Sequence, residues 1–96
     1  MLELAETKEF LRVDGDAEDI LISSLIVTAK ELVENVLRKK LDEFEQVPET
    51  VRQAMLIIVG TLYEERQITK NKEGLDIKTT LDLVRRMLFA YRQEKF

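Results

Sequence analysis

The sequence predicts an all-α protein, a single small domain of about four helices packed like a bundle around a buried central helix at about residues 48–67. Two observations lead to this prediction. Apolar residues recur at three- and four-residue steps along several segments, which is the period of an amphipathic helix. The 96 residues include only three glycines and one proline, and 35% of them are charged, as is typical of a helical globular protein. We expect residues 1–96 to build one hydrophobic core.

The central helix is expected to begin at Pro48. Proline is favoured in a first turn, because its missing N–H would have no partner there, and Glu49 adds negative charge near the positive end of the helix dipole. The apolar run from Ala54 to Val59 covers every direction around a helix, so other helices must surround it. It is far too short to span a membrane, which takes about 20 residues. Gly60 costs about 1 kcal/mol relative to alanine, and we expect a close backbone approach by another helix to explain it.

Three further helices are expected around this one. A short helix over residues 2–11 has Phe10 and Leu11 as its anchors. A second runs from about residue 17 to 40, and an acidic connector over residues 41–46 follows it. The last runs from about residue 77 to 92. The second helix ends in Arg38, Lys39 and Lys40, which complement the negative end of its dipole, and its apolar stripe consists of Ile22, Leu25, Ile26, Ala29, Leu32, Val33, Val36 and Leu37.

The composition excludes much of ordinary enzyme chemistry. Without cysteine the chain has no disulfide, thiol nucleophile or thiolate metal site, and without histidine it lacks the commonest general base. Ser23 and Ser24 have no basic partner that would activate them. We therefore predict no cofactor. No signal peptide or membrane-spanning segment is apparent, so we expect the protein in the cytoplasm or in a particle assembled there.

Charge is divided unevenly along the chain. Residues 1–65 carry 7 basic and 15 acidic side chains, whereas residues 66–96 carry 8 basic and 4 acidic ones. Opposite charge on two parts of one molecule favours head-to-tail association, which closes into a ring or continues as a filament. Two differently charged solvated faces would give the same pattern, and the sequence leaves both interpretations open.

Four glutamates form the main candidate for catalysis. Glu31 and Glu34 on the second helix, with Glu64 and Glu65 on the third, could hold a magnesium ion, as in all-α nucleotide pyrophosphohydrolases. The spacing of Glu31 and Glu34 suits a solvent-facing row better. A nucleic-acid site is a weaker candidate, because the arginines of the last helix do not form a row that could read a groove, although Lys70 and Lys72 could touch phosphate without sequence preference.

The ordered set of these features resembles the head–tail connector family of tailed bacteriophages and prophages, small all-α adaptor or head-completion proteins linked to DNA packaging. The resemblance covers nearly the whole chain, although Ala90 stands where family members often have proline. Its carriers are residues 4–8, 10–12 and 14–19, then Ala29, then Val47, Pro48, Ala54 and residues 62–66, and finally Leu88, Tyr91 and Arg92.

This resemblance implies a non-enzymatic subunit. About a dozen copies would form a ring under the portal protein, extend the DNA channel and offer a surface to the tail or stopper protein. The subunit would reside in the host cytoplasm during assembly and then at the head–tail junction of the virion, with only non-specific proximity to DNA and no membrane contact. The channel- or neighbour-facing loop would be Thr69, Lys70, Asn71, Lys72, Glu73 and Gly74, and the subunit or portal interface would be Arg85, Arg86, Tyr91, Arg92 and Phe96.

Two alternatives stay open at this point. The magnesium-dependent hydrolase would use the four glutamates. A small helical regulator would bind one partner protein and form no ring. For a free monomer, Tyr91 could instead cap the core and Phe96 could be frayed.

Overall fold

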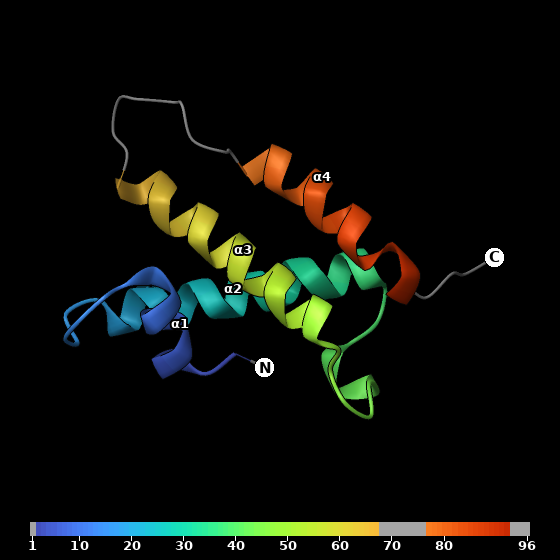
Figure 1. The fold of residues 1–96 in the computed structure, drawn as a ribbon, viewed down its shortest axis with the longest axis horizontal. Helices are drawn as coiled ribbons and strands as arrows, with labels where there is room; N and C mark the ends of the chain where they lie inside the picture. The colour runs from blue at the N-terminus through green and yellow to red at the C-terminus, as the bar shows by residue number, and fades with distance from the viewer. Residues whose placement is uncertain (1, 68–76, 93–96) are drawn as a thin grey trace.

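In the computed structural model, residues 2–67 and 77–92 are described (Figure 1). They form the helices α1 (Leu4–Leu11), α2 (Asp19–Leu37), α3 (Glu49–Gln67) and α4 (Ile77–Leu88), and the short 3-10 turns η1 (Leu41–Glu43) and η2 (Phe89–Tyr91). These residues contain no β-strand. The all-α prediction is confirmed.

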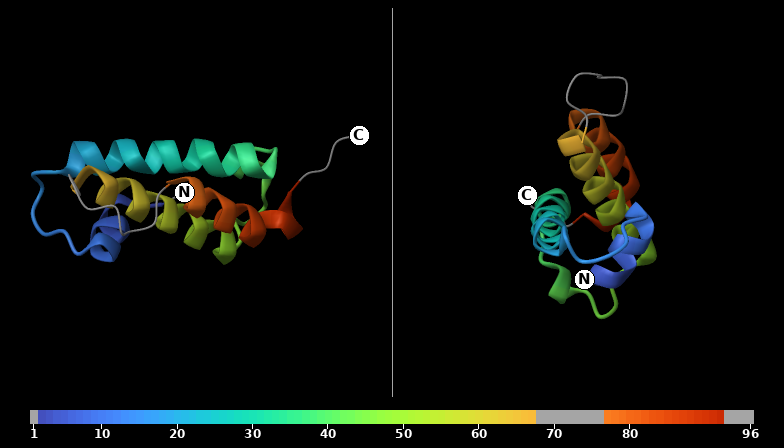
Figure 2. Two further views of the ribbon diagram at one scale, coloured as in Figure 1. Left: turned by 90° about the horizontal axis from the view of Figure 1, so that it is seen from above. Right: turned by 90° about the vertical axis from the view of Figure 1, so that its left-hand side faces the viewer.

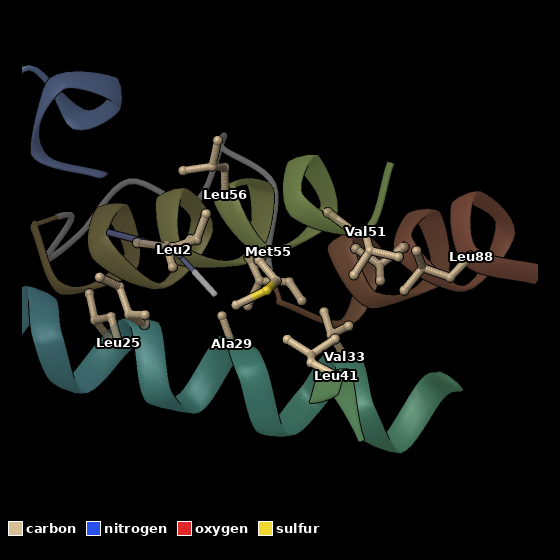
Figure 3. Close-up of a cluster of buried hydrophobic side chains, with 14 of the residues drawn as sticks. Leu2, Leu25, Ala29, Val33, Leu41, Val51, Met55, Leu56 and Leu88 are labelled. Carbon is tan, nitrogen blue, oxygen red and sulfur yellow. The ribbon is translucent and has the colours of Figure 1, made fainter. Parts of the chain in front are cut away.

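Helices α3 and α2 each contact all the other helices, and α3 has the more extensive contact with α4. Helix α3 begins where expected, with the Pro48 carbonyl accepting a hydrogen bond from the Arg52 N–H at 3.1 Å. Within the apolar run only Ile57 is partly exposed. Figure 3 shows apolar side chains of α2 projecting toward those of α3, with Leu88 of α4 in the same cluster. The buried central helix is thereby confirmed.

The explanation expected for Gly60 is wrong in its detail. A side chain, and not the backbone of another helix, approaches this residue: a Cβ on Gly60 would lie 3.3 Å from Cε2 of Phe10 on α1. Phe10 is also a poor anchor, because it is about half exposed. The inward contacts of this segment come from Leu2 and Thr7, which are buried, and Leu11 packs at the edge of the core.

Helix α2 buries its predicted stripe but ends earlier than expected. Six of the eight stripe residues are buried, and Leu32 and Val36 are partly buried. The helix stops at Leu37 because Arg38 adopts a left-handed conformation, with φ 62°, while its N–H still bonds to the Glu34 carbonyl at 2.8 Å. Arg38, Lys39 and Lys40 therefore follow the helix instead of forming its last turn.

The connector after α2 is more ordered than an acidic linker. The Glu34 carboxylate accepts a hydrogen bond from the Leu41 N–H at 2.8 Å, which fixes the start of η1. Leu41 is buried in the core, and the Lys39 ammonium lies 4.0 Å from the centroid of the Phe44 ring. These contacts set the path by which the chain returns to α3.

Helix α4 is amphipathic as predicted, with Val84 and Leu88 buried and Ile77, Leu81 and Tyr91 partly buried. It also carries a polar contact that its apolar period does not reveal: the hydroxyls of Thr80 and Thr61 on α3 form a buried hydrogen bond of 2.9 Å. The α-helix ends at Leu88 and continues as η2, so the expected single helix to Arg92 is wrong in its last turn.

Helix α2 lies on one side of the molecule. Both views of Figure 2 place α2 on one side and α3 and α4 on the other. The outward face of α2 and the outward face of α4 therefore point in different directions. Within the described ranges, none of the helices combines the length and apolar character that crossing a membrane requires.

Candidate functional site

The predicted interface residues of α4 lie on the molecular surface. Arg85 and Arg86 are both exposed, and Arg85 forms an ion pair with Asp82 at 3.0 Å. Exposed pairs of this kind contribute little to folding. Both side chains are therefore accessible to a partner.

Tyr91 and Arg92 are half-buried at the end of η2. The Arg92 N–H bonds to the Phe89 carbonyl at 3.3 Å and closes that turn. The guanidinium Nε of Arg92 is buried but has no hydrogen-bond partner within the described part of the chain. A buried donor without an acceptor is uncommon in folded proteins, so this atom marks a place where a partner would be stabilising.

Arg92 shares a groove with two other arginines. The arginine groove, as we call it, is lined by Asn35, Val36, Arg38, Arg85 and Arg92. Arg38 reaches the groove from the end of α2, and the other two arginines come from α4 and the residue after η2. The lining has three arginines and no carboxylate, although Arg85 also pairs with Asp82 outside it. Such a site is suited to an anion, because guanidinium binds carboxylate or phosphate through two parallel hydrogen bonds.

The sequence pattern indicated only a helix-dipole role for Arg38 and gave no sign of its place in this groove. Arg38 and Arg85 are far apart in the sequence, and only the tertiary packing of α2 against α4 brings them together. The other predicted positions, Thr69 to Gly74 and Phe96, lie outside the described residues.

The four candidate metal ligands do not converge. Glu31 and Glu34 belong to the second half of α2, whereas Glu64 and Glu65 lie near the end of α3, at the other end of the molecule (Figure 1). Among residues 2–67 and 77–92, no three acidic side chains are placed to share a metal ion.

The roles of these glutamates also differ. Glu34 pairs with Lys30 at 3.5 Å and with the η1 backbone, so it is not part of a solvent-facing row. Glu65 accepts a hydrogen bond from the Ile77 N–H at 2.9 Å. Glu31 is exposed, in a groove that it shares with Glu34 and Glu43 and with the basic residues Arg38, Lys39 and Lys40. The basic side chains balance the carboxylates there, and this geometry does not favour the magnesium-dependent hydrolase.

Two polar clusters tie α3 to the N-terminal part of the chain. The Arg52 guanidinium donates hydrogen bonds to Glu6 on α1 and to Glu49, and the bond from Arg52 lowers the pKa of Glu49. The Tyr63 hydroxyl donates to Glu18 at 2.5 Å, and this bond raises the pKa of Tyr63. Both clusters join α3 to another segment of the chain, whereas the one ion pair described for the arginine groove, Arg85 with Asp82, stays within α4.

Comparison with known proteins yields one match. The family described as "Phage gp6-like head-tail connector protein" matches residues 1–92. No curated protein and no solved structure matches the chain. The family match therefore covers nearly the whole sequence and includes all of the described helices.

Proposed function

Since the chain belongs to the phage gp6-like head-tail connector family, we propose that it is a non-enzymatic subunit that joins the capsid portal to the tail. About a dozen copies form a ring beneath the portal protein and extend the DNA channel. The observation that carries this proposal is the family match over residues 1–92. The ring receives the tail or a stopper protein on its other side.

The surface of the subunit supports a role in assembly. Arg85 and Arg86 are exposed on α4, and the arginine groove beside them contains the unpartnered Nε of Arg92. We assign contacts with the neighbouring subunit or the portal to Arg85, Arg86, Tyr91, Arg92 and Phe96. We assign the contact with the channel or a neighbour to residues 69–74, from Thr69 to Gly74, with Lys70 and Lys72 as the groups for DNA contact that does not read its sequence.

The charge of the chain fits contact with protein better than with DNA. The net charge is −4, and duplex DNA binders usually carry an excess of basic residues along the groove that they follow. Carboxylates on a neighbouring protein are the natural ligands of the arginine groove. The subunit is made in the host cytoplasm and ends at the head–tail junction of the virion.

The proposal is tested by assembly with the portal. We expect Arg92→Glu, and removal of residues 91–96, to leave the helical circular dichroism signal largely intact and to abolish ring assembly on the purified portal. Arg12→Glu is the matched control, because Arg12 is an exposed arginine that ends α1. Native mass spectrometry of each variant, alone and with portal, counts the subunits.

The outcomes separate the candidate functions. A closed ring of the wild-type chain supports the connector. A stable one-to-one complex with a single partner, and no ring with or without portal, would instead indicate a small regulator. An Arg92→Glu variant that still assembles and yields infectious particles would remove Arg92 from the interface.

A further inference from the structure

Exposed apolar side chains are concentrated on two surfaces. The four exposed large hydrophobic residues of the described chain are Phe10, Ile20, Val27 and Phe89. Phe10 packs over Gly60 of its own chain, so its position has an explanation within the subunit. Ile20 and Val27 lie seven residues apart on α2, and so on one side of that helix, with 88% and 49% of their surface exposed. Phe89, in η2, is 67% exposed.

The α2 face, as we define it, consists of the exposed residues Ile20, Ser23, Ser24, Val27 and Thr28. The exposed Asp14 and Asp16 precede it in the segment before α2, and Glu31 follows it one turn on. From residue 20 to 29 the helix has no charged side chain, although the chain as a whole is 35% charged. The Thr28 hydroxyl donates a hydrogen bond to the Ser24 carbonyl at 3.1 Å, so its proton does not need water as an acceptor. Every exposed charged residue from Asp14 to Glu31 is acidic. The α2 face is thus uncharged, with two apolar side chains among three hydroxyls, and the charged residues that flank it are acidic except for Lys30, which pairs with Glu34.

The α4 face carries the opposite charge. It consists of the exposed residues Lys78, Asp82, Arg85, Arg86 and Phe89. Their three- and four-residue spacing places them on the side of α4 away from the buried Val84 and Leu88. Three of these residues are basic and one is acidic, and Phe89 supplies an apolar group at one end.

One chain cannot join these two faces to each other. The helices that carry them meet at the arginine groove, but the two faces point in different directions, because each helix turns its other side to the core (Figure 2). Two different, complementary surfaces of one subunit make a heterologous contact, which repeats from copy to copy and closes if the rotation allows. An anionic nucleic acid does not fit the α2 face, because its bordering charges are negative.

We propose that the α2 face of one copy docks on the α4 face of the next copy. Ile20 and Val27 pack near Phe89, while the carboxylates that border the α2 face meet Lys78, Arg85 and Arg86. This inference rests on the proposed function, since it supplies the contact between neighbours in the ring. In this arrangement, α2 of one subunit faces the basic residues near the C-terminus of the adjacent subunit.

The absence of cysteine from the chain allows a direct test by crosslinking. The double variant Val27→Cys/Phe89→Cys is treated with a short bifunctional thiol reagent, and products are separated by denaturing electrophoresis. We expect a ladder of dimer, trimer and larger species. Each single variant alone should stay monomeric on the gel, because a heterologous contact never brings two copies of the same position together. Gln46→Cys/Phe89→Cys is the matched control, as Gln46 is exposed in the segment between η1 and α3 and belongs to neither face.

A charge exchange tests the same contact in the uncrosslinked protein. Arg86→Glu should raise the concentration needed for assembly by about tenfold or more, as removal of a close interfacial charge pair does. Glu31→Arg in the same chain should restore part of the loss. Gln46→Arg, which also changes an exposed residue, should have no effect.

Each outcome bears on one of the two proposals. Closed rings in native mass spectrometry without a Val27–Phe89 ladder, or crosslinked dimers of the Val27→Cys variant alone, overturn the face assignment and leave the connector function standing. A ladder without closed species, with or without portal, supports the contact and counts against the ring. Absence of both overturns the two proposals together.

Discussion

The two ends of the helical domain treat their charged groups in opposite ways. Near α1 and the start of α2, charges are paired within the chain: Lys8 with Asp19 at 2.7 Å, and Arg52 with Glu6 and Glu49. At the C-terminal end, Arg92 has a buried Nε without a described partner, and three arginines share one groove. The N-terminal pairs join different segments of one subunit, whereas at the C-terminal end Arg85 pairs only with Asp82 of its own helix, on the surface, and stays accessible to a second molecule.

The largest effect is expected at the polar contact that holds α4 to α3. Thr80→Val should destabilise the fold by about 1–3 kcal/mol, because it leaves the buried Thr61 hydroxyl without its partner. The double variant Thr61→Val/Thr80→Val should recover most of that loss, since both groups are then apolar. Urea unfolding followed by circular dichroism measures both. Equal losses in the single and double variants would show that the hydrogen bond is unimportant.

A smaller effect is expected at the end of α2, and it separates folding from assembly. Arg38 and Arg12 both adopt left-handed backbone conformations, with φ 62° and 61°. Because such a conformation costs a non-glycine residue about 1 kcal/mol or more, Arg38→Gly and Arg12→Gly should each raise the melting temperature slightly. Only Arg38→Gly removes a guanidinium from the arginine groove, so only that variant should weaken assembly with the portal. Equal assembly of the two variants would exclude Arg38 from the interface.

The comparison between the two ends is sharpened by a pair of arginine substitutions. Arg52→Met removes the link between α1 and α3 and should lower the melting temperature. Arg86→Met removes an exposed arginine and should leave the melting temperature almost unchanged while impairing assembly. Calorimetry and native mass spectrometry of both variants test this division. An inverted result, with Arg86 needed for folding, would contradict it.

The smallest expected effect is a dependence on pH. The hydrogen bond from Arg52 lowers the pKa of Glu49 below its ordinary value of 4.5 in the folded state. The ionised Glu49 therefore stabilises the fold above pH 4.5, and this stabilisation is lost as pH falls through the folded pKa. Glu18 raises the pKa of Tyr63 above 10.0, so that contribution is present below pH 10.0 and is lost at higher pH. The melting temperature of Glu49→Gln should therefore change less than that of the wild type as the pH is lowered. The melting temperature of Tyr63→Phe should change less than that of the wild type as the pH is raised above 10.0.

Periodicity was sufficient to predict the fold but not its polar details. The apolar run of α3 and the stripe of α2 reveal burial directly, because each is determined by neighbours along one helix. The end of α2 was missed because an arginine, and not glycine, takes the left-handed position. The end of α4 has no breaking residue, since Phe89, Ala90 and Tyr91 all permit a helix.

The candidate site was only partly predictable for a related reason. Arg85 and Arg92 follow from their place on the last helix, but their meeting with Arg38 depends on how α2 and α4 pack. The partnership of Thr61 and Thr80 is likewise invisible to a pattern that treats threonine as an ordinary polar residue. Glu34 was expected in solvent, although its carboxylate reaches the backbone seven residues further on.

The buried Nε of Arg92 has a thermodynamic consequence for the free subunit. An unmet buried donor disfavours the state that contains it by about 1–3 kcal/mol. A carboxylate that accepts from this N–H removes that penalty, which amounts to roughly 5- to 150-fold in the association constant. The isolated chain is then the less stable form of the protein. Occupancy of the arginine groove should act mainly by slowing the release of an incorporated copy, because affinity differences between related complexes lie mostly in the dissociation rate.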